Sequence, residues 1–108
     1  MISIFGFLEH ADINAGVQEF QKTEKAMLLD VRTKEEYESG HIENSENIPL
    51  QHIEKVLAII TDKNTPLFVY CQSGARSSSA TSALKQMGYL NITNIGGISS
   101  YRGKVVKG

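Results

Sequence analysis

The sequence has little of several residue types that mark specialised classes of protein. Among its 108 residues there are one cysteine, two prolines and no tryptophan, and the formal net charge is −1. A single cysteine excludes an internal disulfide and any zinc site built from cysteines alone. A nearly neutral chain offers no basic field for phosphates, so we predict no nucleic-acid partner. The apolar stretch at residues 1–8 is far shorter than the roughly 20 residues of a membrane-spanning helix, and we predict no membrane partner.

What is present is the composition of an ordinary globular domain. Hydrophobic residues make up 41% of the chain and charged residues 21%, which predicts a single domain over residues 1–108 with a core of its own. The apolar start, Met1–Leu8, lacks the basic n-region and the cleavage site of a signal peptide. We therefore expect it to be a first strand or a surface segment. A free thiol suits a reducing compartment, which predicts a cytoplasmic location.

Short apolar runs predict the strands. Continuous runs at residues 26–31 and 67–70 are typical of strands buried on both faces. Residues 92–95 predict a last strand, followed by a turn at Gly96–Gly97, and Ile48 predicts a very short one. Because these strands alternate with helical segments, the sequence predicts an α/β domain with a mainly parallel sheet.

The first two helical segments are identified by their expected caps. Asn14 is expected to cap a short helix that turns Val17 and Phe20 inward. Thr33 and Glu36 have the spacing of a capping box and predict a second helical turn, which Gly40 is expected to end.

Two further helices are predicted from apolar spacing. One is expected to begin at Pro49 and to bury one face, made of Leu50, Ile53, Leu57 and Ile60. The other follows Ser79 and is expected to end before Gly88, with an apolar face made of Ala80, Ala83, Leu84 and Met87.

Cys71 lies where the strand at 67–70 gives way to a small polar loop. A loop that leads into a helix N-terminus directs free N–H groups and the positive end of the helix dipole toward its own hollow. Gly74 lets the backbone curl there, and Arg76 adds a positive charge. We therefore predict a thiolate of lowered pKa at an exposed turn, which would be a nucleophile. The alternative is a buried cysteine that serves only as a small core residue.

Three segments of the chain carry a resemblance to a known family. They are residues 28–42, which include Asp30-Val31-Arg32, residues 67–77 around the cysteine, and residues 96–101, which begin with Gly96-Gly97. Their sequence and order resemble the rhodanese family of sulfurtransferases from about Ile13 onward. The resemblance implies a five-stranded, mainly parallel sheet with helices on both faces, and transfer of a sulfane sulfur through a persulfide on Cys71.

The predicted site consists of the cysteine and the loop that follows it. Cys71 is the candidate catalytic residue, and the N–H groups of the loop can hold the charge of a bound sulfur. Arg76 is expected either to orient the loop or to meet an anionic donor, with a structural salt bridge as the alternative. The candidate substrate-binding residues are Gln72, Ser73, Gly74, Ala75, Arg76 and Ser77.

Other polar residues are assigned supporting roles. By resemblance, Asp30 and Arg32 hold the site region through polar contacts, and a thiolate of lowered pKa needs no general base. Ser77 is expected to cap the helix. His41 is interpreted as a hydrogen-bonded structural histidine. No metal or organic cofactor is implied.

Two other functions stay open at this stage. Cysteine-dependent phosphatases and arsenate reductases of related fold place one residue more between cysteine and arginine than the four found here. A non-catalytic binding module would usually have lost the cysteine. Within the sulfurtransferase interpretation, the partners are a small-molecule donor and acceptor, with thiosulfate, a small persulfide and a relay protein's persulfide as donors that fit. We expect a monomer or weak dimer.

Overall fold

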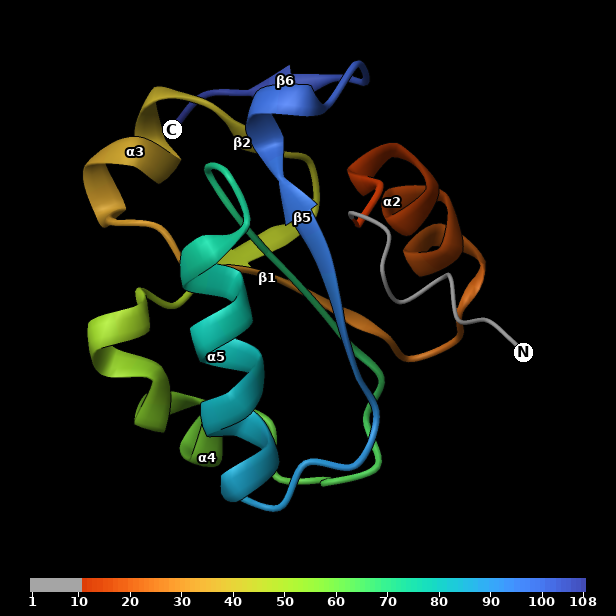
Figure 1. Ribbon diagram of the computed structural model, residues 1–108, viewed down its shortest axis with the longest axis vertical. Coiled ribbons are helices and arrows are strands. Elements are labelled where there is room, and N and C mark those ends of the chain that lie inside the picture. The colour runs from red at the N-terminus through yellow and green to blue at the C-terminus, as the bar shows by residue number, and fades with distance from the viewer. Residues whose placement is uncertain (1–10) are drawn as a thin grey trace.

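A parallel sheet between two layers of helices forms the centre of the molecule in the computed structural model, which describes residues 11–108 (Figure 1). In this part of the chain the sheet has four strands in the order β3-β1-β4-β5, and neighbouring strands run parallel. The strands are β1 (Met27–Asp30), β3 (Ser45–Asn47), β4 (Leu67–Cys71) and β5 (Ile92–Gly97). This confirms the predicted α/β class. The first strand predicted at Met1–Leu8 lies outside the described residues.

A second, two-stranded sheet was not predicted from the sequence. Strand β2 (His41–Ile42) pairs antiparallel with β6 (Val105–Val106), so β5 is not the last strand of the chain. These strands are two residues long, and such short segments carry no clear period. The pairing fastens the C-terminal segment beside α3 (Lys34–Ser39).

Helices cover both faces of the sheet, as the resemblance implied. Helix α2 (Ile13–Lys22) lies on one face, to the right of the sheet in Figure 1. The 3₁₀ helix η1 (Leu50–Lys55), α4 (Val56–Ile59) and α5 (Ala75–Gln86) cover the other.

The strands divide their side chains between these two layers. Leu28, Phe68 and Tyr70 pack in the core beneath α2, whereas Val69 and Cys71 belong to the core beneath α4 and α5. This alternation follows from the two-residue period of a strand. Both cores are apolar, which is why β1 and β4 appear as continuous apolar runs in the sequence.

The prediction for the first helix was right about its inward face and wrong about its cap. Asp12 is the N-cap, and its Oδ1 accepts the Asn14 N–H at 3.0 Å. Asn14 lies in the first turn and donates from Nδ2 to the Ser100 carbonyl at 3.0 Å, which ties α2 to the C-terminal segment. Val17 is buried, and Phe20 meets Phe68 edge to face.

In the segment after Pro49, three of the four predicted inward residues, Leu50, Ile53 and Ile60, pack in the core, and the prediction is wrong for Leu57. Leu57 is 44% exposed, and Val56 is buried instead. The reason is that the 3₁₀ turns of residues 50–55 are interrupted by a kink at His52, whose φ of −123° and ψ of 30° are not helical. A face counted with one continuous α-helical period therefore does not hold across this segment. Ile48 is buried, but it follows β3 and is not a strand.

Several local signals were interpreted correctly. The capping box of Thr33 and Glu36 is present at the start of α3, and Gly40 is its C-cap. Gly88 follows the end of α5 with φ of 99°, a left-handed conformation that favours glycine.

Candidate active site

Cys71 is the last residue of β4 and lies under the loop that leads into α5. Its side chain is only 1% exposed, so the prediction of an exposed turn was wrong. The helix also starts earlier than predicted, at Ala75 and not after Ser79, so the loop proper is short. The Gly74 N–H donates to Sγ at 3.0 Å and the Ser77 N–H at 3.3 Å. The sulfur is thus enclosed by backbone donors at the helix N-terminus.

This environment acts on the ionisation of Cys71 in two opposite ways. Burial raises the pKa of the thiol, because it disfavours the charged form. The hydrogen bond between the Cys71 and Ser77 side chains and those from the N–H groups of Ser77, Gly74 and Ser73 lower it, and together they outweigh burial. The pKa of Cys71 therefore lies below the ordinary thiol value, and the donors of the loop are the main reason.

The loop keeps its shape through two glycines and a hydrogen bond. Gly74 has φ of 109° and serves as the N-cap of α5. Gly97 of β5 passes so close to the loop that an added Cβ would lie 2.6 Å from the Ser73 Cα. The Ser99 N–H donates to the Gln72 carbonyl at 3.1 Å. The predicted turn at Gly96–Gly97 is instead the end of β5, which supports the loop from one side.

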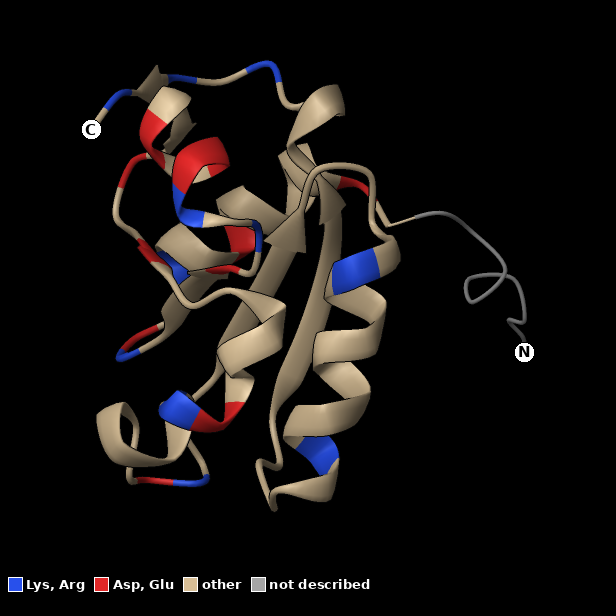
Figure 2. Ribbon diagram, turned by 90° about the vertical axis from the view of Figure 1, so that its left-hand side faces the viewer, with Lys and Arg blue, Asp and Glu red and all other residues tan. Residues whose placement is uncertain are grey.

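Arg76 forms an ion pair with Glu36 of α3. Its Nη1 and Nη2 lie 2.7 and 3.0 Å from the two carboxylate oxygens. This bidentate contact holds the pKa of Glu36 at about 2. The charged residues of α5 are Arg76 and Lys85, near its two ends, and Figure 2 shows the turns between the blue bands of this helix without charge. The ion pair with Glu36 therefore ties α5 to α3.

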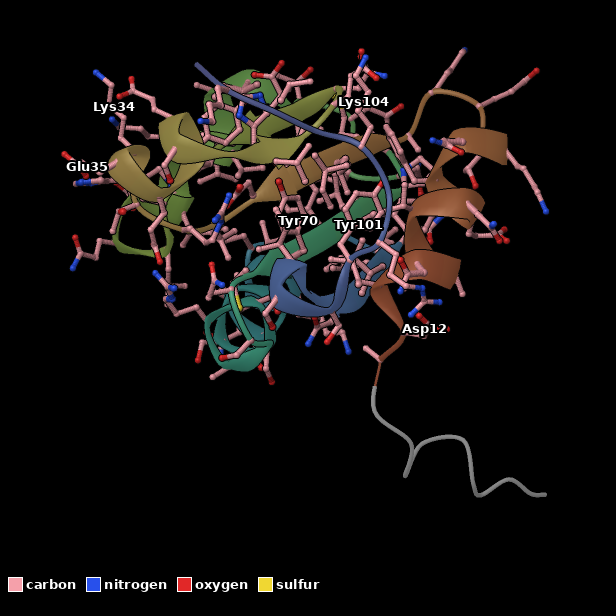
Figure 3. All side chains as sticks on the ribbon, turned by 90° about the horizontal axis from the view of Figure 1, so that it is seen from above. Asp12, Lys34, Glu35, Tyr70, Tyr101 and Lys104 are labelled. Carbon is pink, nitrogen blue, oxygen red and sulfur yellow. The ribbon has the colours of Figure 1, made fainter. Side chains whose placement is uncertain are left out.

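Asp30 and Arg32 form a buried pair at the end of β1. Asp30 is fully buried and Arg32 is 4% exposed, and Arg32 Nη2 lies 2.7 Å from Asp30 Oδ2. Arg32 Nη1 reaches Gln72 Oε1 at 3.3 Å, which links the pair to the cysteine loop. The guanidinium also lies 5.8 Å from the centre of the Tyr70 ring. Figure 3 shows Tyr70 in the interior of the molecule. The structure thus brings Asp30 and Arg32 next to the loop.

Ser77 does not cap α5, and it contacts a residue that the sequence analysis missed. The N-cap is Gly74, and the buried Ser77 side chain points toward the sulfur, with Oγ 3.4 Å from Sγ. Its hydroxyl donates to Asn94 Oδ1 of β5 at 2.8 Å. The only signal for Asn94 in the sequence was a polar residue within a predicted strand.

A cavity of about 400 Å³ lies beside the loop. Among residues 11–108, those that line it carry no charged side chain; they are Ala11, Ile13, Ser73, Gly74, Asn94, Gly96, Gly97, Ser99 and Ser100. His41 lies away from this cavity, stacked on Tyr37 with its Nδ1 2.8 Å from the Tyr37 carbonyl oxygen, as expected of a structural histidine.

Comparisons with known proteins agree with the geometry. The family model of the rhodanese-like domain matches residues 14–104. The chain belongs to the rhodanese-like family. It is 37% identical over 81 residues to thiosulfate sulfurtransferase PspE of Escherichia coli (strain K12), covering 74% of this chain and 78% of the relative.

Two solved structures extend this rhodanese-like assignment. A structure of a rhodanese with anions from E. coli has a TM-score of 0.72 and 36% identity, over 77% of this chain and 99% of the other. A rhodanese-related protein from Thermoplasma volcanium has a TM-score of 0.70 and 33% identity, and the match covers 84% of this chain and 93% of the other. Within residues 11–108, no helix combines the length and the apolar character needed to cross a membrane.

Proposed function

We propose that this protein is a sulfurtransferase that moves a sulfane sulfur from a donor to a thiophilic acceptor through a persulfide on Cys71. The observation that carries the proposal is the enclosure of Cys71 Sγ by N–H groups of Gly74 and Ser77 at the start of α5. Membership of the rhodanese-like family and the similarity to a thiosulfate sulfurtransferase support it.

The reaction takes place in two displacements at sulfur. The Cys71 thiolate attacks the outer sulfur of the donor, a new S–S bond forms, and the donor's own bond to that sulfur breaks. The leaving group, sulfite from thiosulfate or a thiolate from a persulfide, takes the electron pair. The acceptor then attacks the terminal sulfur and the Cys71 thiolate leaves, which restores the enzyme. This cycle needs no metal or organic cofactor.

The loop can stabilise the charge that develops on sulfur. N–H groups in the first turn of a helix have no acceptor within the helix, and those of α5 begin at Ala75. Two donors from this segment already contact Sγ, so neighbouring ones are available for a terminal sulfur. Arg32 and Asp30 would keep the loop in place through Gln72.

The charge of the site favours a persulfide over thiosulfate as the natural donor. Arg76 carries the only formal charge in the loop, and Glu36 neutralises it. In the described part of the chain, the residues that line the cavity beside the loop are uncharged. A dianion would therefore be attracted weakly, whereas a small persulfide or the persulfide of a relay protein would be accepted. The cytoplasmic location and the monomeric or weakly dimeric state stay predictions.

The first test is a thiosulfate-to-cyanide assay combined with intact-mass analysis. We expect the wild type to gain one sulfur atom from thiosulfate and to lose it to cyanide. Cys71→Ser keeps a polar group of similar size but cannot form a persulfide, so it should show neither change. Transfer that persists in this variant would contradict the proposal.

The same proteins separate the two other functions. An aryl phosphate offered to the wild type and to Cys71→Ser should be hydrolysed equally slowly by both. Hydrolysis that depends on Cys71, without sulfur transfer, would favour a phosphatase. Stable capture of a partner by the wild type with no persulfide formed would favour a binding module.

A further inference from the structure

The Ser77 hydroxyl has one proton and three acceptors within reach. Its oxygen lies 2.8 Å from Asn94 Oδ1, 3.0 Å from the Gly74 carbonyl oxygen and 3.4 Å from Cys71 Sγ. A hydroxyl donates one hydrogen bond at a time, and Asn94 offers the shortest. The contact with Asn94 therefore competes directly with a hydrogen bond to the sulfur.

The direction of the Ser77–Asn94 hydrogen bond follows from Gly96. The Gly96 N–H can only donate, and it points to Asn94 Oδ1 at 3.0 Å, which identifies that atom as the amide oxygen. An amide oxygen carries no proton, so the proton between Ser77 and Asn94 comes from Ser77. With its own proton used in this way, Ser77 Oγ can only accept from the Cys71 thiol.

This arrangement suits the neutral thiol and not the thiolate. A thiol proton can be donated to Ser77 Oγ, but a thiolate would face a lone pair of that oxygen. When Cys71 loses its proton to solvent, the Ser77 hydroxyl gains more by turning from Asn94 toward the sulfur. We propose that Asn94 is a positioning residue that holds the Ser77 proton away from Cys71 in the resting protein and yields it to the thiolate.

Asn94 would act without any change of charge. Strand β5, Ile92–Gly97, carries no titratable residue. The charged groups near Cys71 come from other elements: Arg76 of α5 with its partner Glu36 of α3, and the Asp30–Arg32 pair that follows β1. Substitution of Asn94 by a neutral residue leaves all of them in place. Any shift in the ionisation of Cys71 would then report the hydrogen bond.

The test measures the rate of Cys71 alkylation by iodoacetamide as a function of pH. Asn94→Ala frees the Ser77 hydroxyl for the sulfur, so the inflection should move down by about half to one pH unit, the effect of one hydrogen bond. Ser77→Ala should move it up. In the Ser77→Ala background, Asn94→Ala should cause no further shift, because its effect passes through the hydroxyl. Thr93→Ala, an exposed neighbour on the same strand, is the matched control and should leave the inflection unchanged.

A second variant protects the test against a local disturbance of β5. Asn94→Ser can still accept the Gly96 N–H two residues on, but it is too short to reach Ser77, and it should reproduce the downward shift. An unchanged or raised inflection in Asn94→Ala and Asn94→Ser would overturn the inference, as would an equal shift in both backgrounds. The inference rests on the proposed function only in treating Cys71 as the nucleophile. Alkylation needs no sulfur transfer, so the two can fail separately.

Discussion

At the scale of single residues, the cysteine loop depends on a glycine outside it. Gly97 has φ of −122°, which any residue can adopt, so its backbone conformation does not require glycine. The requirement comes from close approach. An added Cβ would overlap the Gln72 carbonyl oxygen and lie 2.6 Å from the Ser73 Cα, and these are backbone atoms that cannot swing aside.

We expect Gly97→Ala to displace the loop and to lower sulfur transfer strongly, since a shift of about one ångström at a reacting centre can cost a hundredfold. Overpacking should also lower the free energy of unfolding by about 1–3 kcal/mol. The control is Gly88→Ala, which introduces strain at a left-handed position after α5, away from the loop. That variant should lose stability and keep its activity. A Gly97→Ala protein with unchanged kinetics would show that the close approach is not needed.

Glu36 controls how much of the Arg76 charge a donor can meet. Glu36→Gln weakens the ion pair, so the released guanidinium should attract thiosulfate and lower its KM by roughly two- to fivefold, the scale of an exposed ion pair. The effect should shrink as salt screens the charge. Glu35→Gln makes the same change of net charge on the neighbouring, exposed residue and is the matched control. If both variants respond equally, net charge and not Arg76 is responsible.

At the scale of elements, α2 and β5 approach each other through Gly16. An added Cβ at this position would overlap the Ile95 side chain at its Cβ, which is fixed to the strand and buried. We expect Gly16→Ala to push the helix from the sheet and to lower the free energy of unfolding by about 1–3 kcal/mol, although alanine is the better helix former. Denaturant unfolding beside Gln18→Ala, on the exposed side of the same helix, measures this. A more stable Gly16→Ala protein would mean that helix propensity outweighs the contact.

The sequence predicted an element best where a contiguous run of residues is buried at every position. Strand β4 is buried at every position, and its apolar run located it to within a residue. The helix after Pro49 was predicted less well, because a kink at His52 interrupts the helical period, and beyond it Val56 is buried and Leu57 exposed. Asp12 and Asn14 are both good caps, and nothing local decides between them.

The parts of the site that are contiguous in the sequence could be predicted, and the parts that come from distant elements could not. Cys71 and its loop follow from a contiguous strand, turn and helix. Asn94 could not be found in this way, because its contact with Ser77 joins residues 17 apart in sequence on different elements. The thiol also lies beside β5, where Cys71 is paired with Gly97, and this neighbour is not visible in the residues next to Cys71.

At the scale of the whole molecule, the site lies at the edge of the parallel sheet where the carboxyl ends of its strands meet. Asp30, Cys71 and Gly97 are the last residues of β1, β4 and β5, three neighbouring strands, so the fold itself brings the buried pair, the thiol and the supporting glycine together. The Arg76–Glu36 ion pair closes this end by joining α5 to α3. Its strength should therefore appear in the stability of the whole fold.

The pH dependence of unfolding tests that link. In the folded protein the pKa of Glu36 is about 2, and its ordinary value is about 4.3. The ionised carboxylate therefore stabilises the fold fully above about pH 5, and this contribution is lost as the pH falls toward 2. Both side chains are about one-third exposed, so solvent screening limits the contribution to about 1 kcal/mol or less. The difference in unfolding free energy between wild type and Glu36→Gln should be greatest near neutral pH and should disappear near pH 2. Glu35→Gln, the same change at the exposed neighbour of Glu36, is the matched control and should show a smaller difference at neutral pH. A Glu36→Gln difference that stays constant down to pH 2 would contradict this link, because it would not come from the ionisation of the carboxylate.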